Sequence, residues 1–96
     1  MAAFAVAAFD INDRSWVREY LANTAALIQR HGGRYLARGS EHETVEGDHT
    51  PDVIVILEFP TMDALRGWYD DPEYAPLRDA RRAGTTGTFH LVPGDA

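Results

Sequence analysis

The run Val53-Ile-Val-Ile-Leu-Glu-Phe59 constrains the fold more than any other stretch of the chain. Six of its seven residues are apolar, and the turn-forming stretch Gly47-Asp-His-Thr-Pro51 stands just before it. A strand with apolar side chains on both faces is typical of the interior of a sheet. We therefore predict a central strand over residues 53–59.

Three further stretches have the pattern of strands. Ala3 to Phe9 is apolar at successive positions, which again favours burial on both faces. Arg34 to Glu46 predicts a long strand, in which Gly39 marks either a bulge or a close approach of another backbone. Thr86 to Val92 predicts the last strand.

Apolar residues at three- and four-residue steps predict a helix between the first two strands. Asn12 or Asp13 supplies the capping side chain at its start. Gly32-Gly33 ends it, because glycine tolerates the left-handed conformation that follows many helices. The residues of the stripe are Trp16, Val17, Tyr20, Leu21, Thr24, Leu27, Ile28 and His31.

A second helical region follows the central strand and is interrupted. Thr61 is its expected cap, and Gly84 ends it. Asp71-Pro72 stops the first helix and starts another turn, because proline suits the first turn of a helix. Its stripe comprises Met62, Leu65, Trp68 and Tyr69 before the break, and Tyr74, Leu77 and Arg81 after it.

The expected order βαββαβ defines a single α+β domain over residues 1–96. Two crossovers around a central hairpin give the ferredoxin-like arrangement. Right-handed crossovers place the four antiparallel strands in the order 4-1-3-2, with both helices on one face. The other face still carries apolar side chains, and an exposed apolar patch of this kind marks an interface. We therefore expect a homodimer joined sheet to sheet.

Composition excludes several classes of partner. A formal net charge of -6 supplies no excess of basic residues for a nucleic-acid backbone. The apolar start, MAAFAVAAFD, lacks a basic leading segment and is too short to cross a bilayer, which takes about 20 residues. The chain has no cysteine, which fits a reducing compartment. We expect a cytoplasmic protein that binds neither nucleic acid nor membrane.

Three stretches together resemble a known family: residues 31–41, residues 53–83 and the last strand. They carry the motifs GGRYL, EFP and WYDxPEYxPL in this order. The chain resembles the family called domain of unknown function 1330, which is similar in fold to the dimeric α/β-barrel proteins. A serine often precedes Pro-Glu-Tyr in that family, whereas this chain has Asp71, which caps a helix equally well. The stretch Gly84 to Leu91 diverges from the family.

The resemblance implies a dimeric α/β barrel but no particular activity. Relatives of the fold include cofactor-free oxygenases, isomerases, cyclases and ligand binders without catalytic activity. An activity carried over from any of them rests on analogy.

Arg38 and Glu58 are the first candidate pair for chemistry. A hairpin that turns near Asp48 places residues opposite each other when their numbers sum to about 96, so these two are expected to be cross-strand neighbours. Arg38 would then anchor an anion or a carbonyl, and Glu58 would accept a proton. The alternative is a structural ion pair that fixes the register of the hairpin.

His31 is the second candidate, at the end of the first helix and facing Tyr35. An imidazole there could act as a general base near neutral pH. The alternative is a histidine that interacts with the last carbonyl groups of the helix.

Aromatic residues form the third candidate group. Because the helix breaks after Trp68-Tyr69, the following turn can fold over and wall a cavity between the sheet and the broken helical region. The alternative is that these rings only fill a small core. The expected substrate-binding residues are Tyr20, Tyr35, Trp68, Tyr69 and Tyr74.

A metal site is not expected. His42 and Glu43 point to opposite faces of a strand, His49 lies on the turn, and the spacing to His90 matches no standard site. We expect chemistry without a cofactor on a small organic molecule, such as isomerisation, cyclisation or oxygenation of an activated aromatic or polyketide-like compound. Arg38 would orient the substrate, Glu58 or His31 would move a proton, and Tyr69 or Tyr74 would donate to an oxyanion.

Two other functions remain open at this stage. The protein could bind a small ligand without catalysis, or it could be an interaction module whose pocket is filled by its own side chains. An open cavity lined by Arg38, Glu58 or His31 favours an enzyme. An open cavity with only apolar walls favours a binder, and a filled interior favours the module.

Overall fold

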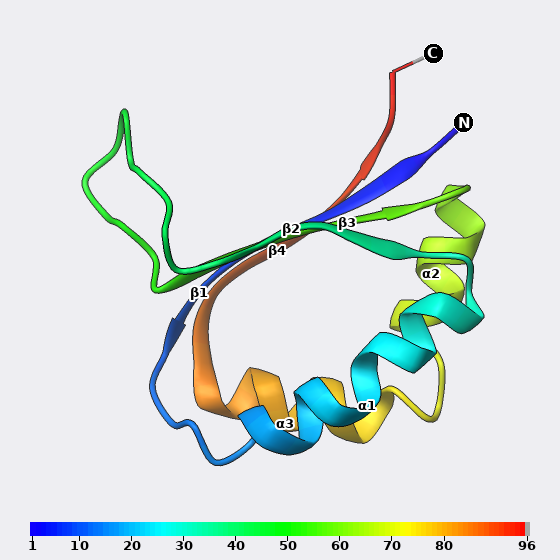
Figure 1. Cartoon of the computed structure of the whole chain (residues 1–96), viewed down its shortest axis with the longest axis horizontal. Coiled ribbons are helices and arrows are strands. Elements are labelled where there is room, and N and C mark those ends of the chain that lie inside the picture. Colours follow the sequence, from blue (N-terminus) through cyan, green and yellow to red (C-terminus); the bar gives the residue numbers. More distant parts are fainter. Residues whose placement is uncertain (96) are drawn as a thin grey trace.

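The computed structural model describes residues 1–95 and shows one sheet with all helices on one side of it (Figure 1). The sheet has the order β2-β3-β1-β4, with antiparallel neighbours throughout. This confirms the ferredoxin-like fold and the strand order expected from the sequence. The elements are β1 (Ala3–Ile11), α1 (Val17–Arg30), β2 (Arg34–Gly39), β3 (Val53–Phe59), α2 (Met62–Tyr69), α3 (Ala75–Gly84) and β4 (Thr85–Pro93).

The inner face of the sheet, toward the helices, is set by the alternation of side chains in β1. Ala3, Ala5, Ala7 and Phe9 are buried there, and their neighbours across the ladders are inner-face residues of β3 and β4. Three of these four positions in the central strand hold only a methyl group. A layer of alanine beneath the middle of the sheet leaves room between the sheet and the helices, which becomes important for the site.

Local chemistry explains where the helices begin. Thr61 caps α2 as predicted, because its hydroxyl accepts a hydrogen bond from the Ala64 amide at 3.0 Å. The start of α1 was predicted too early. The carboxylate of Asp13 accepts a hydrogen bond from the Ser15 amide at 2.8 Å, which forms a turn, and the helix starts only at Val17.

The prediction of a long second strand was wrong, because β2 ends at Gly39. Gly39 has a φ of 151°, a conformation that favours glycine, and here the chain leaves the sheet. The bulge lies between Tyr35 and Ala37 instead of at Gly39. Side-chain hydrogen bonds, in place of a ladder, hold the loop 40–52 against the end of β1.

Asp10 makes the main contacts to that loop. Its carboxylate lies 2.6 Å from Nε2 of His49 and accepts a hydrogen bond from the Asp52 amide at 3.1 Å. Asp52 in turn accepts a hydrogen bond from the Ile11 amide at 2.9 Å. Nε2 of His42 lies 2.7 Å from the carbonyl oxygen of Pro51. His42 and His49 are therefore parts of a folded loop.

No helix covers the outer face of the sheet, which is the upper side in Figure 1. The ladders place apolar residues there, as the sequence predicts, and these side chains are only partly buried in one chain. They are Phe4, Val6, Ala8, Ile54, Ile56 and Val92. Within residues 1–95, no helix is long and apolar enough to cross a membrane.

Candidate functional site

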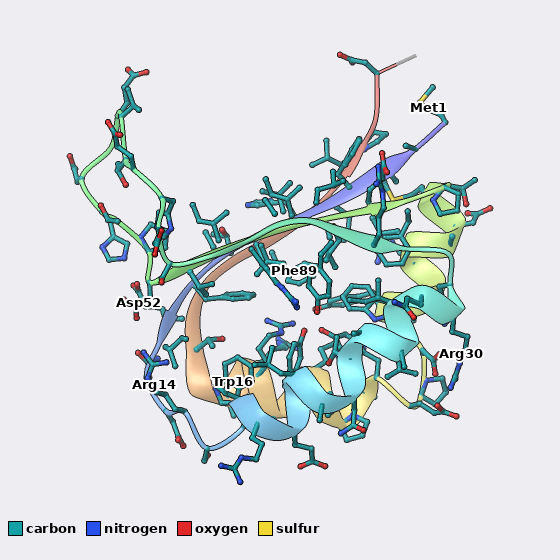
Figure 2. All side chains as sticks on the ribbon, in the orientation of Figure 1. Met1, Arg14, Trp16, Arg30, Asp52 and Phe89 are labelled. Carbon is teal, nitrogen blue, oxygen red and sulfur yellow. The ribbon has the colours of Figure 1, made fainter. Side chains whose placement is uncertain are left out.

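A cavity of about 470 Å³ lies between the inner face of the sheet and the helices. Ala5 and Ala7 of β1 form part of its roof, and Ala25 and Ile28 of α1 form part of its wall. Small side chains on both sides therefore keep the space open. Figure 2 shows Phe89 pointing from the sheet into this space and Trp16 on its opposite side, at the start of α1.

The cavity lies elsewhere than the sequence predicts. Its walls come mainly from α1 and the sheet, with Trp68 as the contribution of α2 and Arg81 as that of α3. The broken helical region was expected to form the wall. The break instead lets α3 pass beneath the sheet, which brings Arg81 under the strands.

Tyr20 and Tyr74 meet beside the cavity. Their hydroxyl oxygens are 2.6 Å apart, and Tyr20 lines the cavity. Burial raises the pKa of Tyr20 well above its usual value, and the neighbouring Tyr74 raises it further. Burial likewise raises the pKa of Tyr74. Both phenols therefore keep their protons at neutral pH, and one of the two protons is left over from their shared hydrogen bond.

Arg81 is the most unusual residue of the cavity. It is 3% exposed, yet its Nε and Nη2 atoms have no hydrogen-bond acceptor among residues 1–95. Its guanidinium carbon lies 4.9 Å from the ring centre of Phe9 and 5.0 Å from that of Phe89. The two rings stabilise the cation, while part of its N–H edge stays unpaired.

The charge of Arg81 is set by opposing influences. Burial acts to lower the pKa of Arg81, but the phenols of Tyr74 and Tyr20 outweigh it and raise that pKa. Arg81 therefore stays charged at neutral pH. Arg81 takes part in no ion pair within the described chain. Arg78, on the same helix, donates a hydrogen bond from Nη1 to the Tyr69 carbonyl at 2.8 Å.

Trp68 adds a second unpaired donor. Its ring is completely buried, 4.4 Å from the ring centre of Tyr74 and 5.5 Å from that of Phe59. Its Nε1 atom has no acceptor among residues 1–95. Trp68 lines the cavity, so a second N–H group without an acceptor among residues 1–95 lies buried beside the site.

Arg38 and Tyr35 lie at the β2 side of the cavity. The guanidinium carbon of Arg38 is 4.2 Å from the ring centre of Tyr35, and Arg38 is exposed. Burial raises the pKa of Tyr35, although Arg38 acts to lower it. Leu21 of α1 lines the same cavity and is 56% exposed. The cavity therefore opens to solvent beside a cation.

The predicted pairing of Arg38 with Glu58 is wrong. Glu58 lies opposite Arg34, whose Nε donates to Oε1 of Glu58 at 2.9 Å. The bulge after Tyr35 shifts the register, so that Arg38 lies opposite Val55. Arg38 therefore faces the cavity, whereas Glu58 lies on the outer face of the sheet in a structural ion pair with Arg34.

His31 lies outside the cavity. Its Nε2 atom is 2.8 Å from Oδ2 of Asp71, at the junction between α2 and α3. The hydrogen bond from His31 lowers the pKa of Asp71, and the Glu73 amide bound to the same carboxylate lowers it too. Neither sequence interpretation of His31 foresaw this partner. The pair joins the end of α1 to the helix break.

The five predicted aromatic residues divide into two groups. Tyr20, Tyr35 and Trp68 line the cavity. Tyr74 lies behind Tyr20, shares a hydrogen bond with it and adjoins Arg81. Tyr69 points elsewhere, with its ring centre 5.2 Å from that of Phe89 and 5.3 Å from the guanidinium carbon of Arg78. Trp68 thus points into the core and its neighbour Tyr69 does not.

Arg81 was not among the residues predicted for the site. The signal was present, because Tyr74, Leu77 and Arg81 follow one another at helical spacing on one stripe. A charged residue on the stripe of an otherwise apolar face needs a partner or a ligand. Within residues 1–95, no three His, Cys, Asp or Glu side chains gather as a metal site would require.

Comparisons with known proteins match the chain to one protein family and to several solved structures. The model of the family described as "Domain of unknown function (DUF1330)" matches residues 2–95. No curated protein shows a significant match to the chain.

Several solved structures have the same fold. A protein of unknown function from Rhodopseudomonas palustris has a TM-score of 0.81 at 16% identity, over 99% of this chain and 83% of that one. SnoaB, a cofactor-independent oxygenase from Streptomyces nogalater, has a TM-score of 0.67 at 22% identity, over 99% and 94%. A dimeric ferredoxin-like protein of unknown function from Thermobifida fusca has a TM-score of 0.59 at 15% identity, over 98% and 92%. These likenesses show the fold.

Proposed function

Since the chain belongs to the domain of unknown function 1330 family, whose name assigns no activity, we propose a function from its cavity. The protein binds a small organic molecule there and carries out proton-transfer chemistry on it without a cofactor. One observation supports this above the others: the cavity of about 470 Å³ has mainly apolar walls and is lined by Arg81, whose Nε and Nη2 have no acceptor within residues 1–95.

The reaction starts with the loss of a proton, either from a carbon beside a carbonyl or from a ring hydroxyl itself. Isomerisation, cyclisation and oxygenation of an activated aromatic or polyketide-like compound all share this step. The resulting anion is costly in an apolar cavity unless donors face its oxygen. Arg81 and the phenol of Tyr20 supply such donors. The likeness to SnoaB supports oxygenation by analogy.

The cavity lining lacks the predicted bases. Glu58 and His31 lie outside it, and the phenols of Tyr20 and Tyr35 keep their protons because burial raises the pKa of each. We therefore assign catalysis to stabilisation of the anion. A guanidinium beside the substrate oxygen lowers the pKa of the bound substrate, so that water can take the proton.

The second candidate function is binding without catalysis. One observation favours it: within residues 1–95, no Asp, Glu or His lines the cavity. A binder needs only the apolar wall and a few donors, and both are present.

The protein works as a cytoplasmic homodimer in this proposal. The apolar outer face, with Val6 and Ile56 opposite each other at its centre, would be covered by a second copy. The dimeric ferredoxin-like neighbours support this arrangement.

Exchange of carbon-bound protons tests the reaction. The substrate probe is 2-tetralone, an aromatic ketone with acidic protons beside its carbonyl, and NMR in D₂O follows their replacement by deuterium. We expect the protein to accelerate exchange, and Ala25→Phe, which fills the cavity, to abolish the acceleration. Ala22→Phe is the matched control, because Ala22 is exposed on the same helix.

The outcomes separate the two candidate functions. If 2-tetralone binds but exchanges no faster than in buffer, the protein is a binder. If a ligand retained from the native host appears in native mass spectra of wild type and of Ala25→Phe alike, the cavity is not the binding site.

A further inference from the structure

Arg81 is a buried cation for which residues 1–95 provide no ion-pair partner. The sequence holds 15 Asp and Glu residues and a net charge of -6, so acidic partners are abundant. Arg30, Arg34 and Arg78 each pair with a carboxylate, and all three are more exposed than Arg81. A buried charge without a counterion costs stability. The fold therefore buries Arg81 between aromatic rings and phenols and gives it no counterion within residues 1–95.

The surroundings of Arg81 enclose its bonding edge without pairing it within residues 1–95. Phe9 and Phe89 contact the guanidinium at 4.9 and 5.0 Å from their ring centres, and such contacts satisfy its π faces. Nε and Nη2 have no acceptor within residues 1–95. These two N–H groups lie on one edge of the guanidinium, the edge that binds carboxylates with two parallel hydrogen bonds.

The other polar groups beside the cavity are also donors. Nε1 of Trp68 is buried and has no acceptor within the described chain. The Tyr20–Tyr74 pair holds two phenol protons and shares one hydrogen bond, so one proton can point at a ligand. No carboxylate in the described part of the chain lines the cavity. A set of donors with a positive charge selects an oxygen that bears a negative charge.

We propose that this cavity is a binding site for an organic anion whose charged oxygen is attached to a flat, conjugated ring system. The oxygen pairs with the free edge of Arg81, and the rings lie against the apolar walls between β1 and α1. This inference rests on the proposed function and names the class of its substrate. The charged oxygen belongs either to a carboxylate or to an enolate or phenolate, which share this chemistry.

Size and entry agree with such a ligand. A cavity of about 470 Å³ lies within the range of small-molecule sites and accommodates two or three fused rings. Arg38 stands at the opening, where it stacks on Tyr35 and is exposed to solvent. A cation at the entrance attracts an anion to a protein whose net charge would otherwise repel it.

Two probes with the same ring system and similar size test the carboxylate. Calorimetry compares 2-naphthoate with the neutral 2-naphthylmethanol on wild type and on Arg81→Met. We expect wild type to prefer naphthoate by about tenfold or more, as charged hydrogen bonds predict. Arg81→Met loses this preference but still binds the alcohol. Arg82→Met is the matched control: it removes an exposed charge from the same helix and keeps the preference.

A third probe tests the enolate or phenolate. The absorbance of 2-naphthol reports its ionisation, and we expect wild type to lower its pKa on binding while Arg81→Met does not. Either a carboxylate preference or a lowered naphthol pKa that depends on Arg81 supports the proposal. Absence of both effects in wild type overturns it, as does their survival in Arg81→Met.

The results distinguish failure of this inference from failure of the proposed function. Equal binding of naphthoate and the alcohol leaves the cavity a small-molecule site without anion selectivity. Binding of no probe removes both proposals. Arg81→Met removes a buried charge, so we expect the ligand-free variant to melt no lower than wild type. Arg81→Lys keeps the charge but loses the two parallel N–H donors of the guanidinium. We expect this variant to keep only part of the preference for naphthoate.

Discussion

The hydroxyl oxygens of Tyr20 and Tyr74 lie 2.6 Å apart and join the first turn of α1 to the residue before α3. The two rings meet edge to face, with their centres 6.0 Å apart. Because Tyr20 lines the cavity and Tyr74 is completely buried behind it, the same hydrogen bond fixes the wall of the site and the position of α3, which carries Arg81.

Removal of either hydroxyl should destabilise the fold. Tyr20→Phe leaves the Tyr74 hydroxyl buried without its partner, so we expect the free energy of unfolding to fall by about 1–2 kcal/mol. Tyr74→Phe should cost a similar amount, and the double variant less than the sum of the two. Urea unfolding measures all three. Tyr69→Phe is the control, since Tyr69 takes no part in the hydrogen bond between Tyr20 and Tyr74, and strict additivity would contradict the coupling.

The contact between His31 and Asp71 should make stability depend on pH. The pKa of Asp71 lies below its usual 3.8 in the folded protein, chiefly through the hydrogen bond from His31. A carboxyl whose pKa is lowered by folding contributes stability above its unfolded pKa and loses it as the pH falls through the folded pKa. We expect the stability lead of wild type over Asp71→Asn to shrink once the pH drops below 3.8.

The control for that experiment uses the same pair. In a His31→Asn background, where the main cause of the lowered pKa is gone, the effect of Asp71→Asn should vary less with pH. Thermal melts between pH 2 and pH 7 measure both differences. A stability difference between wild type and Asp71→Asn that stays constant across this range would show that His31 does not lower the pKa of the Asp71 carboxyl.

The sequence patterns determined the fold but not the register. Apolar runs and helical stripes set the order of elements, and Thr61 revealed its capping role through its position before an apolar stripe. The pairing of Arg38 with Glu58 failed because a loop over residues 40–52 replaces the expected hairpin, so that Arg34 already lies opposite Glu58 before the bulge. One inserted residue between Tyr35 and Ala37 then places Arg38 on the inner face. A one-residue shift reverses every side chain that follows it, and no local signal in β2 marks it.

The site was predicted only in part for a related reason. Tyr20, Tyr35 and Trp68 line the cavity because large rings on helix and strand stripes point inward. Arg81 was placed on the helical stripe with Tyr74 and Leu77 but was not assigned to the site. Its burial depends on how α3 packs beneath the sheet, and this follows from tertiary contacts such as the one between Tyr20 and Tyr74.

Gly84 should be intolerant of any side chain. A Cβ atom there would lie 2.4 Å from Cδ1 of Trp16 and 2.9 Å from the carbonyl oxygen of Asp13, whose amide donates a hydrogen bond to the Gly84 carbonyl at 3.1 Å. We expect Gly84→Ala to lower the free energy of unfolding by about 1–3 kcal/mol, as overpacking of a core does. Gly67→Ala is the comparison, because its Cβ would meet the His31 ring at longer distances, 3.3 Å from Nδ1 and 3.6 Å from Cε1. Equal stability of the two variants would contradict this.

The outer face of the sheet should hold two copies together. Ile56 lies opposite Val6 on this face, so Ile56→Lys places a charge in the middle of the proposed interface. We expect sedimentation equilibrium to give wild type twice the chain mass of 10.7 kDa and to give Ile56→Lys the mass of one chain. Gln29→Lys, an exposed change on α1, should remain dimeric. A monomeric wild type at micromolar concentration, or a dimeric Ile56→Lys, would remove the sheet face as the contact between subunits.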